Sequence, residues 1–239
     1  MLSFLALGLV VGMAHALEAD HLAAVGTLAT KNANTRRRLA WLGASWGLGH
    51  TTTLFLLSLP VLLLGFVLTA RIEAGLEVGV GLMLVALGVG VLVRMRRDKV
   101  HFHLHDHRDG ARHFHVHSHG SAQTPHHTDR HDHEHRRLFS GRSYVVGLIH
   151  GAAGSAGLVA LAAAATQDLG VTFLYILLFG LGSTLGMALL TCAASWPLQR
   201  AEVAAGRFFL FAQGAMACFA VAVGLGVVAS AGPIMLGVG

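Results

Sequence analysis

The sequence predicts an all-α integral membrane protein of about six transmembrane helices, arranged as two inverted three-helix repeats with a histidine-rich loop between them. Hydrophobic residues make up 54% of the 239 positions and charged residues only 12%, a balance that soluble domains do not need. Six stretches are apolar and long enough to cross a hydrocarbon core of about 30 Å, which takes about 20 residues. A polar stretch rich in histidine interrupts them in the middle of the chain.

The six apolar stretches give the expected order of the helices. The first lacks a basic segment before it and carries Glu18, Asp20 and His21 where a signal peptide has small residues at its cleavage site, so we expect it to be retained. The predicted helices cover approximately 2–28, 39–68, 72–94, 144–166, 170–195 and 205–231.

Composition divides the chain into three regions, 1–94, 95–143 and 144–239. The middle region is polar and basic, and its few apolar residues cannot offset the conformational entropy that is lost on ordering. We therefore expect a disordered loop between two blocks of three transmembrane helices.

The two blocks share a pattern of small residues and histidine. The segment Gly47–Thr51 matches Gly180–Thr184 at four of five positions, and a glycine-rich segment with a histidine, His15 or His150, precedes each. The intervals from that histidine to the fourth residue of the matching segment are 35 and 33 residues. Because three is an odd number of helices, the two blocks enter the membrane in opposite senses, as in the inverted repeats of many secondary transporters.

The positions of the basic residues predict the topology. Sixteen of the 17 Lys and Arg residues lie in the connections on one side of the predicted membrane, and Arg71 alone lies on the other. The positive-inside rule makes the first side cytoplasmic, with the histidine-rich loop there and both termini outside. The basic residues behind the formal charge of +5 thus mark the topology in the lipid bilayer of the cytoplasmic membrane, and we expect no nucleic-acid partner. The sequence carries no signal for an oligomeric state.

The first helix holds the cluster of residues that points to function. His15, Glu18, Asp20 and His21 lie within an otherwise apolar segment, where each central charge costs about 2.5–3.5 kcal/mol. A divalent cation offsets this cost, because carboxylate oxygens and neutral imidazole nitrogens are its natural ligands. At 100° per residue, Asp20 lies about 140° from His15, so either the helix unwinds here or other helices complete the ligand set.

Two histidines outside the first helix are further candidate ligands. His50 follows Gly47 and Gly49, which allow helices to approach closely, and precedes three threonines. His150 occupies the equivalent place in the second block. The alternative is that such histidines only hold helices together through hydrogen bonds.

The middle region is a second candidate metal site. Thirteen of the 17 histidines fall between residues 101 and 135, often at every second position. Imidazoles with nearby carboxylates bind nickel, cobalt, zinc or copper at neutral pH, here weakly and without selectivity. The alternating residues are His101, His103, His105, His107, His113, His115, His117 and His119.

Two other classes of membrane protein place histidine, acid or cysteine residues in the membrane. A metalloenzyme is not favoured, because no His-Glu-x-x-His run occurs and only four histidines lie in the predicted helices. A thiol-redox carrier needs a reactive cysteine pair, whereas Cys192 and Cys218 lie in different predicted helices without a Cys-x-x-Cys motif. We therefore do not expect an enzyme.

The motifs resemble those of the nickel/cobalt permease family. The run His15-x4-Asp20-His21 resembles the first motif of that family, and Leu48–Thr52 resembles its second. Six predicted helices and the segment 147–155 are most similar to the shorter, urease-accessory branch of the superfamily.

The resemblance implies nickel uptake across the cytoplasmic membrane, with His15, Asp20, His21 and His50 at the transport site. It implies no cofactor beyond the transported ion, which is Ni²⁺ or Co²⁺, with Zn²⁺ as a further candidate. The histidine-rich loop is also similar to that of nickel/cobalt efflux proteins, so export is the alternative direction.

Overall fold

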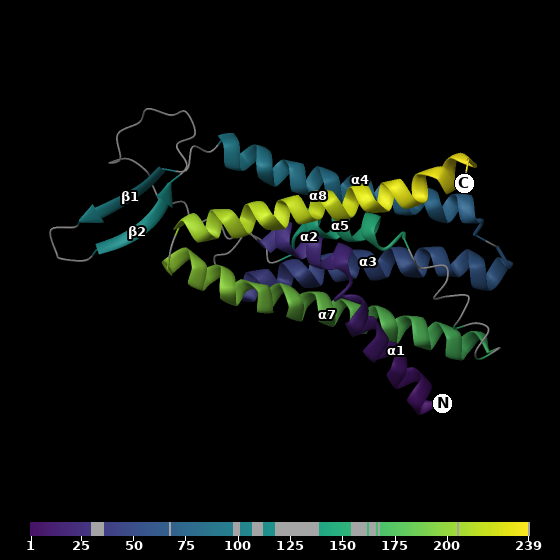
Figure 1. Ribbon diagram of the computed structural model, residues 1–239. Coiled ribbons are helices and arrows are strands. Elements are labelled where there is room, and N and C mark those ends of the chain that lie inside the picture. Colours follow the sequence, from purple (N-terminus) through teal and green to yellow (C-terminus); the bar gives the residue numbers. More distant parts are fainter. Residues whose placement is uncertain are drawn as a thin grey trace.

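The computed structural model is a bundle of helices with a β-hairpin at one end (Figure 1). It describes residues 1–29, 36–66, 68–97, 101–106, 112–117, 139–153, 162, 166, 168–204 and 206–238. Its elements are α1 (Leu2–His15), α2 (Ala19–Ala29), α3 (Arg36–Leu64), α4 (Ala70–Arg97), β1 (His101–Asp106), β2 (Arg112–His117), α5 (Gly141–His150), α7 (Leu169–Ala204) and α8 (Gly206–Leu236).

Four of the described helices are long and apolar enough to cross a membrane, and the pair α1 and α2 adds a fifth crossing if it is counted as one. The four are Arg37–Leu64, Ala70–Arg97, Leu169–Ala194 and Leu210–Leu236. They agree with four of the six predicted stretches, and the chain is a multi-pass helical membrane protein. Of the predicted helix 144–166, α5 and the turn after it are described, and most of the remainder lies outside the described residues.

The first predicted helix is broken. α1 ends at His15 and α2 begins at Ala19, and the two helices are bent by 54°. The N–H of Glu18 donates to the carbonyl of His15 in the intervening turn. Asp20 thereby lies in the first turn of α2, where the helix dipole favours a carboxylate. The structure combines the two arrangements that the sequence left open, because the helix is unwound here and residues of other helices join those of the first segment.

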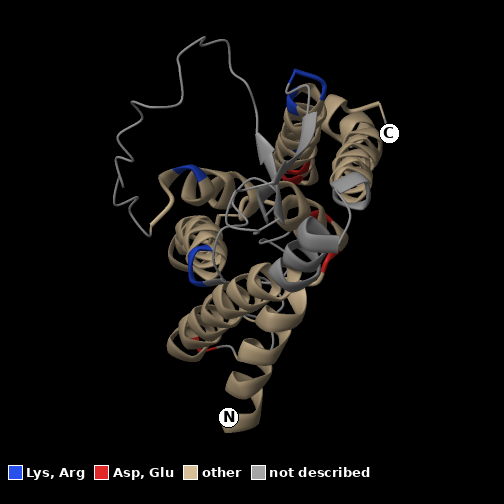
Figure 2. Cartoon of the chain, turned by 90° about the vertical axis from the view of Figure 1, so that its left-hand side faces the viewer, with Lys and Arg blue, Asp and Glu red and all other residues tan. Residues whose placement is uncertain are grey.

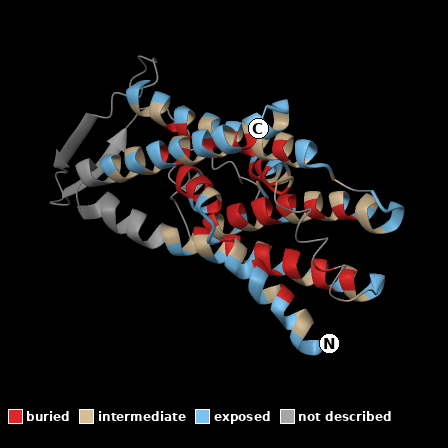
Figure 3. Cartoon of the chain, turned by 45° about the vertical axis from the view of Figure 1, so that its right-hand side comes forward, coloured by how far each residue is buried: buried red, intermediate tan, exposed pale blue. Residues whose placement is uncertain are grey.

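The central helices α3 and α7 pack against each other and run in opposite directions. A Cβ on Gly43 would meet Met187, and a Cβ on Gly47 would meet Thr184, so the residue numbers rise along one helix as they fall along the other. Buried residues concentrate along these two helices, whereas α8 has few of them (Figure 3).

Helix α1 packs against α7 and runs in the same direction. A Cβ on Gly8 would meet Tyr175, and a Cβ on Gly12 would meet the backbone of Phe179. The missing glycine side chains therefore let the two backbones approach closely.

Helix α5 packs against α3 and runs in the same direction as α3. The N–H of Ser140, before α5, donates to Oγ of Ser45 at 3.1 Å, and Gly151, after α5, lies against the backbone of His50. Because α3 and α7 are antiparallel, α1 and α5 approach the centre of the bundle from opposite ends. They stop close to His50, the middle residue of α3.

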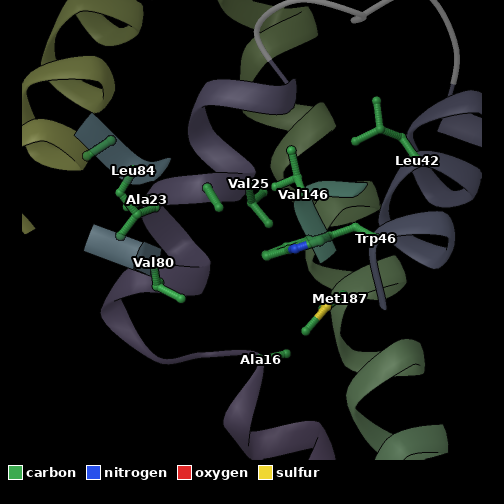
Figure 4. Close-up of a cluster of buried hydrophobic side chains, with 11 residues drawn as sticks. Ala16, Ala23, Val25, Leu42, Trp46, Val80, Leu84, Val146 and Met187 are labelled. Atoms are coloured by element: carbon green, nitrogen blue, oxygen red, sulfur yellow. The ribbon is translucent and has the colours of Figure 1, made fainter. Parts of the chain in front are cut away.

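A cluster of buried apolar side chains holds these helices together beside the broken segment (Figure 4). Trp46 of α3 points between α2 and α5, toward Val25 and Val146, and Met187 of α7 lies below it. The outer helices α4 and α8 form a pair of their own, in which Gly81 and its neighbours face α8 closely.

The strands β1 and β2 form an antiparallel hairpin within the region 95–143. Disorder is expected throughout this region from its composition, and the structure differs at these two strands. Histidine at every second position is a period-two pattern, which is compatible with a strand. Residues 107–111 and 118–138 lie outside the described residues.

Replacing glycine by alanine usually stabilises a helix. At the glycines of the central helix contacts we expect it to lower the stability instead. In Gly147→Ala the new Cβ would meet the carbonyl of Trp46, so we expect a loss of about 1–3 kcal/mol in stability from overpacking. Gly90→Ala on α4 is the matched control, because a Cβ there meets nothing within 4 Å. It should gain up to about 1 kcal/mol from helix propensity. Thermal unfolding of each variant in detergent, with the folded fraction read by gel filtration, gives its melting temperature. Equal changes in melting temperature for the two variants would contradict this packing.

Candidate metal centre

The break after α1, the middle of α3 and the end of α5 bring five polar side chains together. The ligand atoms of His15, His21 and His50 lie within 4.8 Å of one another, and so do those of Asp20, His21 and His150. We call these the first and the second triad. The structure thus gathers five of the six membrane residues that the sequence singles out, although they come from both halves of the chain.

Asp20 is the bridge of the second triad. Its Oδ1 lies 2.9 Å from Nδ1 of His21 and also accepts the backbone N–H of the same residue at 2.8 Å. Its Oδ2 lies 2.9 Å from Nε2 of His150. One carboxylate therefore joins α2 to α5, two helices from opposite halves of the chain.

Four of the remaining imidazole nitrogens of the centre lie buried without a hydrogen-bond partner. These are Nε2 of His21, Nδ1 and Nε2 of His50, and Nδ1 of His150. Each of the three side chains is only about 1% exposed. An unsatisfied buried polar group costs about 1–3 kcal/mol, and a cation is a partner for several such nitrogens at once.

Glu18 lies outside both triads. Its Oε1 is 2.7 Å from Nδ1 of His15, and its side chain is 56% exposed, against 19% for His15. A carboxylate that holds one nitrogen of a histidine fixes the ring orientation and leaves the other nitrogen available. Glu18 is a candidate ligand from the sequence, and in the structure its carboxylate contacts His15 without joining either triad.

The distances within the triads suit a transition-metal ion. Metal–nitrogen bonds are about 2.0–2.1 Å, so two nitrogens on opposite sides of an ion are about 4 Å apart. The ligand atoms of each triad lie within 4.8 Å of one another, and small side-chain movements suffice to close around an ion. Imidazole nitrogens with a carboxylate oxygen form a donor set for nickel, cobalt or zinc.

The sequence analysis missed Trp46 as part of this centre. Its ring centroid lies 5.5 Å from those of His21 and His150, and its buried Nε1 has no partner. Trp46 precedes His50 by one helical turn, and this i, i+4 spacing is the signal that places both on one face of α3.

Ser183 of α7 is a second residue near the centre to which sequence reasoning assigned no function. It is the counterpart of His50 in the matching segments of the two blocks, and its side chain is fully buried. Its Oγ has no hydrogen-bond partner. Phe179, one turn earlier, has its ring centroid 5.4 Å from that of His15.

The hairpin holds six of the eight alternating histidines of the middle region, whereas His107 and His119 lie outside the described residues. Its register sets histidine opposite histidine at three alternate pairs of positions. The pairs are His101 and His117, His103 and His115, and His105 and His113.

No family model and no solved structure matches the chain. Over 198 residues the chain is 32% identical to the urease accessory protein UreH of Bacillus sp. (strain TB-90). The match covers 82% of this chain and 78% of the relative. The chain therefore belongs to the UreH family, the urease-accessory branch of the nickel/cobalt transporter superfamily, and it is not an enzyme.

Proposed function

We propose that this protein carries a divalent transition-metal ion, nickel in preference to cobalt, across the cytoplasmic membrane into the cell. The observation that carries the proposal is the set of buried, unpartnered imidazole nitrogens around Asp20 at the middle of the bundle. Intramembrane ionisable residues mark ion pathways, and here the donor atoms converge from three separate helices. An ion held at this place is half-way along α3.

Electrostatics favours a cation over any other substrate at this centre. The carboxylate of Asp20 is only 26% exposed, and an ionised group at mid-membrane costs about 2.5–3.5 kcal/mol on the insertion scale. A divalent ion offsets that charge, and the neutral histidines add nitrogen ligands without adding charge. The family relationship favours nickel among the ions that this donor set accepts.

The proposal includes an arrangement of the regions 1–94 and 144–239 as inverted repeats. The pairing of α1 with α7 and of α5 with α3 supports it, because exchanging the two halves turns one pairing into the other. Individual residue contacts also correspond when the two halves are exchanged. Gly12 lies against the backbone of Phe179, and Gly147 lies against the backbone of Trp46.

The same exchange relates the surroundings of the two helix-ending histidines. His15 packs beside Phe179 at 5.4 Å, and His150 packs beside Trp46 at 5.5 Å, both measured between ring centroids. Transporters with inverted repeats bind their substrate at mid-membrane between the repeats and rock around it. We propose that rocking of the two halves opens the centre to one side and then to the other.

The orientation that we propose puts the hairpin in the cytoplasm and both termini outside. Basic residues at the ends of α3, α4 and α5 support it, because they lie at the hairpin end of the bundle (Figure 2). The positive-inside rule makes this end cytoplasmic. The histidines of the hairpin and of the remainder of the loop then receive ions that leave the centre.

Removing His21 should abolish transport, because His21 belongs to both triads. Cells that express the wild-type chain should accumulate more radioactive nickel than empty cells, and His21→Ala should return the accumulation to the background. Ser58→Ala is the matched control. Ser58 is equally buried on α3, and its hydroxyl only donates to the carbonyl of Phe55 in its own helix.

Other outcomes of this experiment would contradict separate parts of the proposal. Less nickel in wild-type cells than in empty cells, restored by His21→Ala, would make the protein an exporter. Equal nickel in all strains, with the chain present in the membrane, would contradict metal transport.

Competition between ions should follow the nitrogen-rich donor set. An about hundredfold excess of Mg²⁺, which prefers six oxygen ligands, should leave nickel uptake unchanged, whereas the same excess of Co²⁺ should reduce it. The measurement is the initial rate of nickel uptake at a fixed nickel concentration. Inhibition by Mg²⁺ as strong as that by Co²⁺ would argue against imidazole ligands.

The histidines of the loop should affect the amount of nickel bound and not the path through the membrane. Replacing the thirteen histidines between residues 101 and 135 by asparagine should lower the nickel bound per purified molecule several-fold. The initial uptake rate should fall less than in His21→Ala. Complete loss of uptake would show that the loop belongs to the pathway itself.

A further inference from the structure

The two triads share His21 and differ in every other member. His15 and His50 belong only to the first, whereas Asp20 and His150 belong only to the second. The triads also differ in the helix end that each contains, because α1 reaches the centre from one end and stops at His15, whereas α5 reaches it from the other end and stops at His150. We call these ends the α1 side and the α5 side.

We propose that the ion occupies the two triads one after the other, and that His21 passes it from the first position to the second. This inference rests on the proposed function and deepens it. Two positions then take the place of one site: a position of three imidazoles that faces the α1 side, and a position with a carboxylate that faces the α5 side.

The geometry around His21 carries the proposal. One of its nitrogens, Nδ1, lies 2.9 Å from Oδ1 of Asp20, within the second triad. The other nitrogen, Nε2, is buried and has no partner. The ring centroid of His21 lies 4.5 Å from that of His15 and 4.1 Å from that of His150. His21 therefore belongs to both triads, has one nitrogen without a partner, and has its ring beside those of both helix-ending histidines.

The distances argue against a single site with all five residues. The ring centroids of His50 and His150 are 6.2 Å apart, and the ligand atoms that come within 4.8 Å of one another in the described residues form two triads and not one larger group. His50 has both nitrogens free, whereas His150 already has Nε2 on Asp20. Enclosing one ion with all five residues would need larger movements than filling either triad.

The hydrogen bonds make the two positions unequal before an ion arrives. In the first triad, Nδ1 of His15 lies on Glu18, but an incoming ion meets nitrogens of His21 and His50 that have no partner. In the second, it has to replace the hydrogen bonds that Asp20 makes with His21 and His150. The first position is therefore open to an ion, and the second opens only when Asp20 changes from a hydrogen-bond acceptor to a ligand.

The test uses nickel flux measured from each side of the membrane. Intact cells offer nickel to one side, and inside-out membrane vesicles offer it to the other, with the full-length chain in both. The variants are His50→Gln, which removes a ligand of the first position only, and His150→Gln, which removes one of the second only. Gel filtration in detergent verifies that each variant is folded.

The relay predicts that the two variants exchange their effects on KM and on the maximal rate when nickel is supplied from the other side. With nickel on the α1 side, His50→Gln should raise KM about tenfold or more, whereas His150→Gln should keep KM within about twofold and lower the maximal rate about tenfold. With nickel on the α5 side, His150→Gln should raise KM, and His50→Gln should lower the maximal rate. His21→Ala should eliminate flux from both sides.

Equal increases of KM in both variants from both sides would overturn the relay and leave nickel transport in place. Absence of any nickel flux through the wild-type chain would instead overturn the proposed function. If a glutamine variant does not fold, His15→Gln replaces His50→Gln and the nearly isosteric Asp20→Asn replaces His150→Gln. A raised KM for Asp20→Asn with nickel on the α1 side, and an unchanged maximal rate, would equally overturn the relay.

Discussion

The carboxylate of Asp20, in a bundle built for lipid, is the constraint on which the centre depends. A charge at this depth needs partners, and Asp20 has them in two imidazoles and one backbone N–H. The backbone partner exists only because α1 stops at His15 and a new helix begins at Ala19. The break in the first transmembrane segment is thus part of how the chain tolerates an acid at this depth.

The same constraint explains the close packing of the central helices. Histidine and aspartate side chains are short, so donor atoms from α2, α3 and α5 meet only where the backbones come close together. Gly49 lies against the backbone of Tyr144, and Gly147 lies against that of Trp46, and both contacts lie in the turn of α3 that leads to His50. Small residues at the helix contacts and polar residues at the centre are therefore two parts of one arrangement.

The positions of the helices could be predicted from the sequence, because they depend on hydropathy and local spacing. Contacts between residues far apart in the chain could not. The helix expected at 72–94 is Ala70–Arg97 in the structure, because a long apolar run leaves few alternatives. The bond between Asp20 and His150 joins residues 130 positions apart, and no local pattern indicates such a pair. Trp46 went unnoticed because an aromatic residue in an apolar helix carries no polar signal.

The two halves of the protein contribute unequally to the centre. The first half supplies His15, Asp20, His21 and His50, whereas the described part of the second supplies His150 and has Ser183 where its counterpart has histidine. The carboxylate of Asp20 belongs to the second of the two proposed positions. An ion that moves there from three neutral imidazoles gains attraction to a negative charge. The net direction still depends on the gradients, and a membrane potential that is negative inside contributes about 4.6 kcal/mol per 100 mV to the inward movement of a divalent cation.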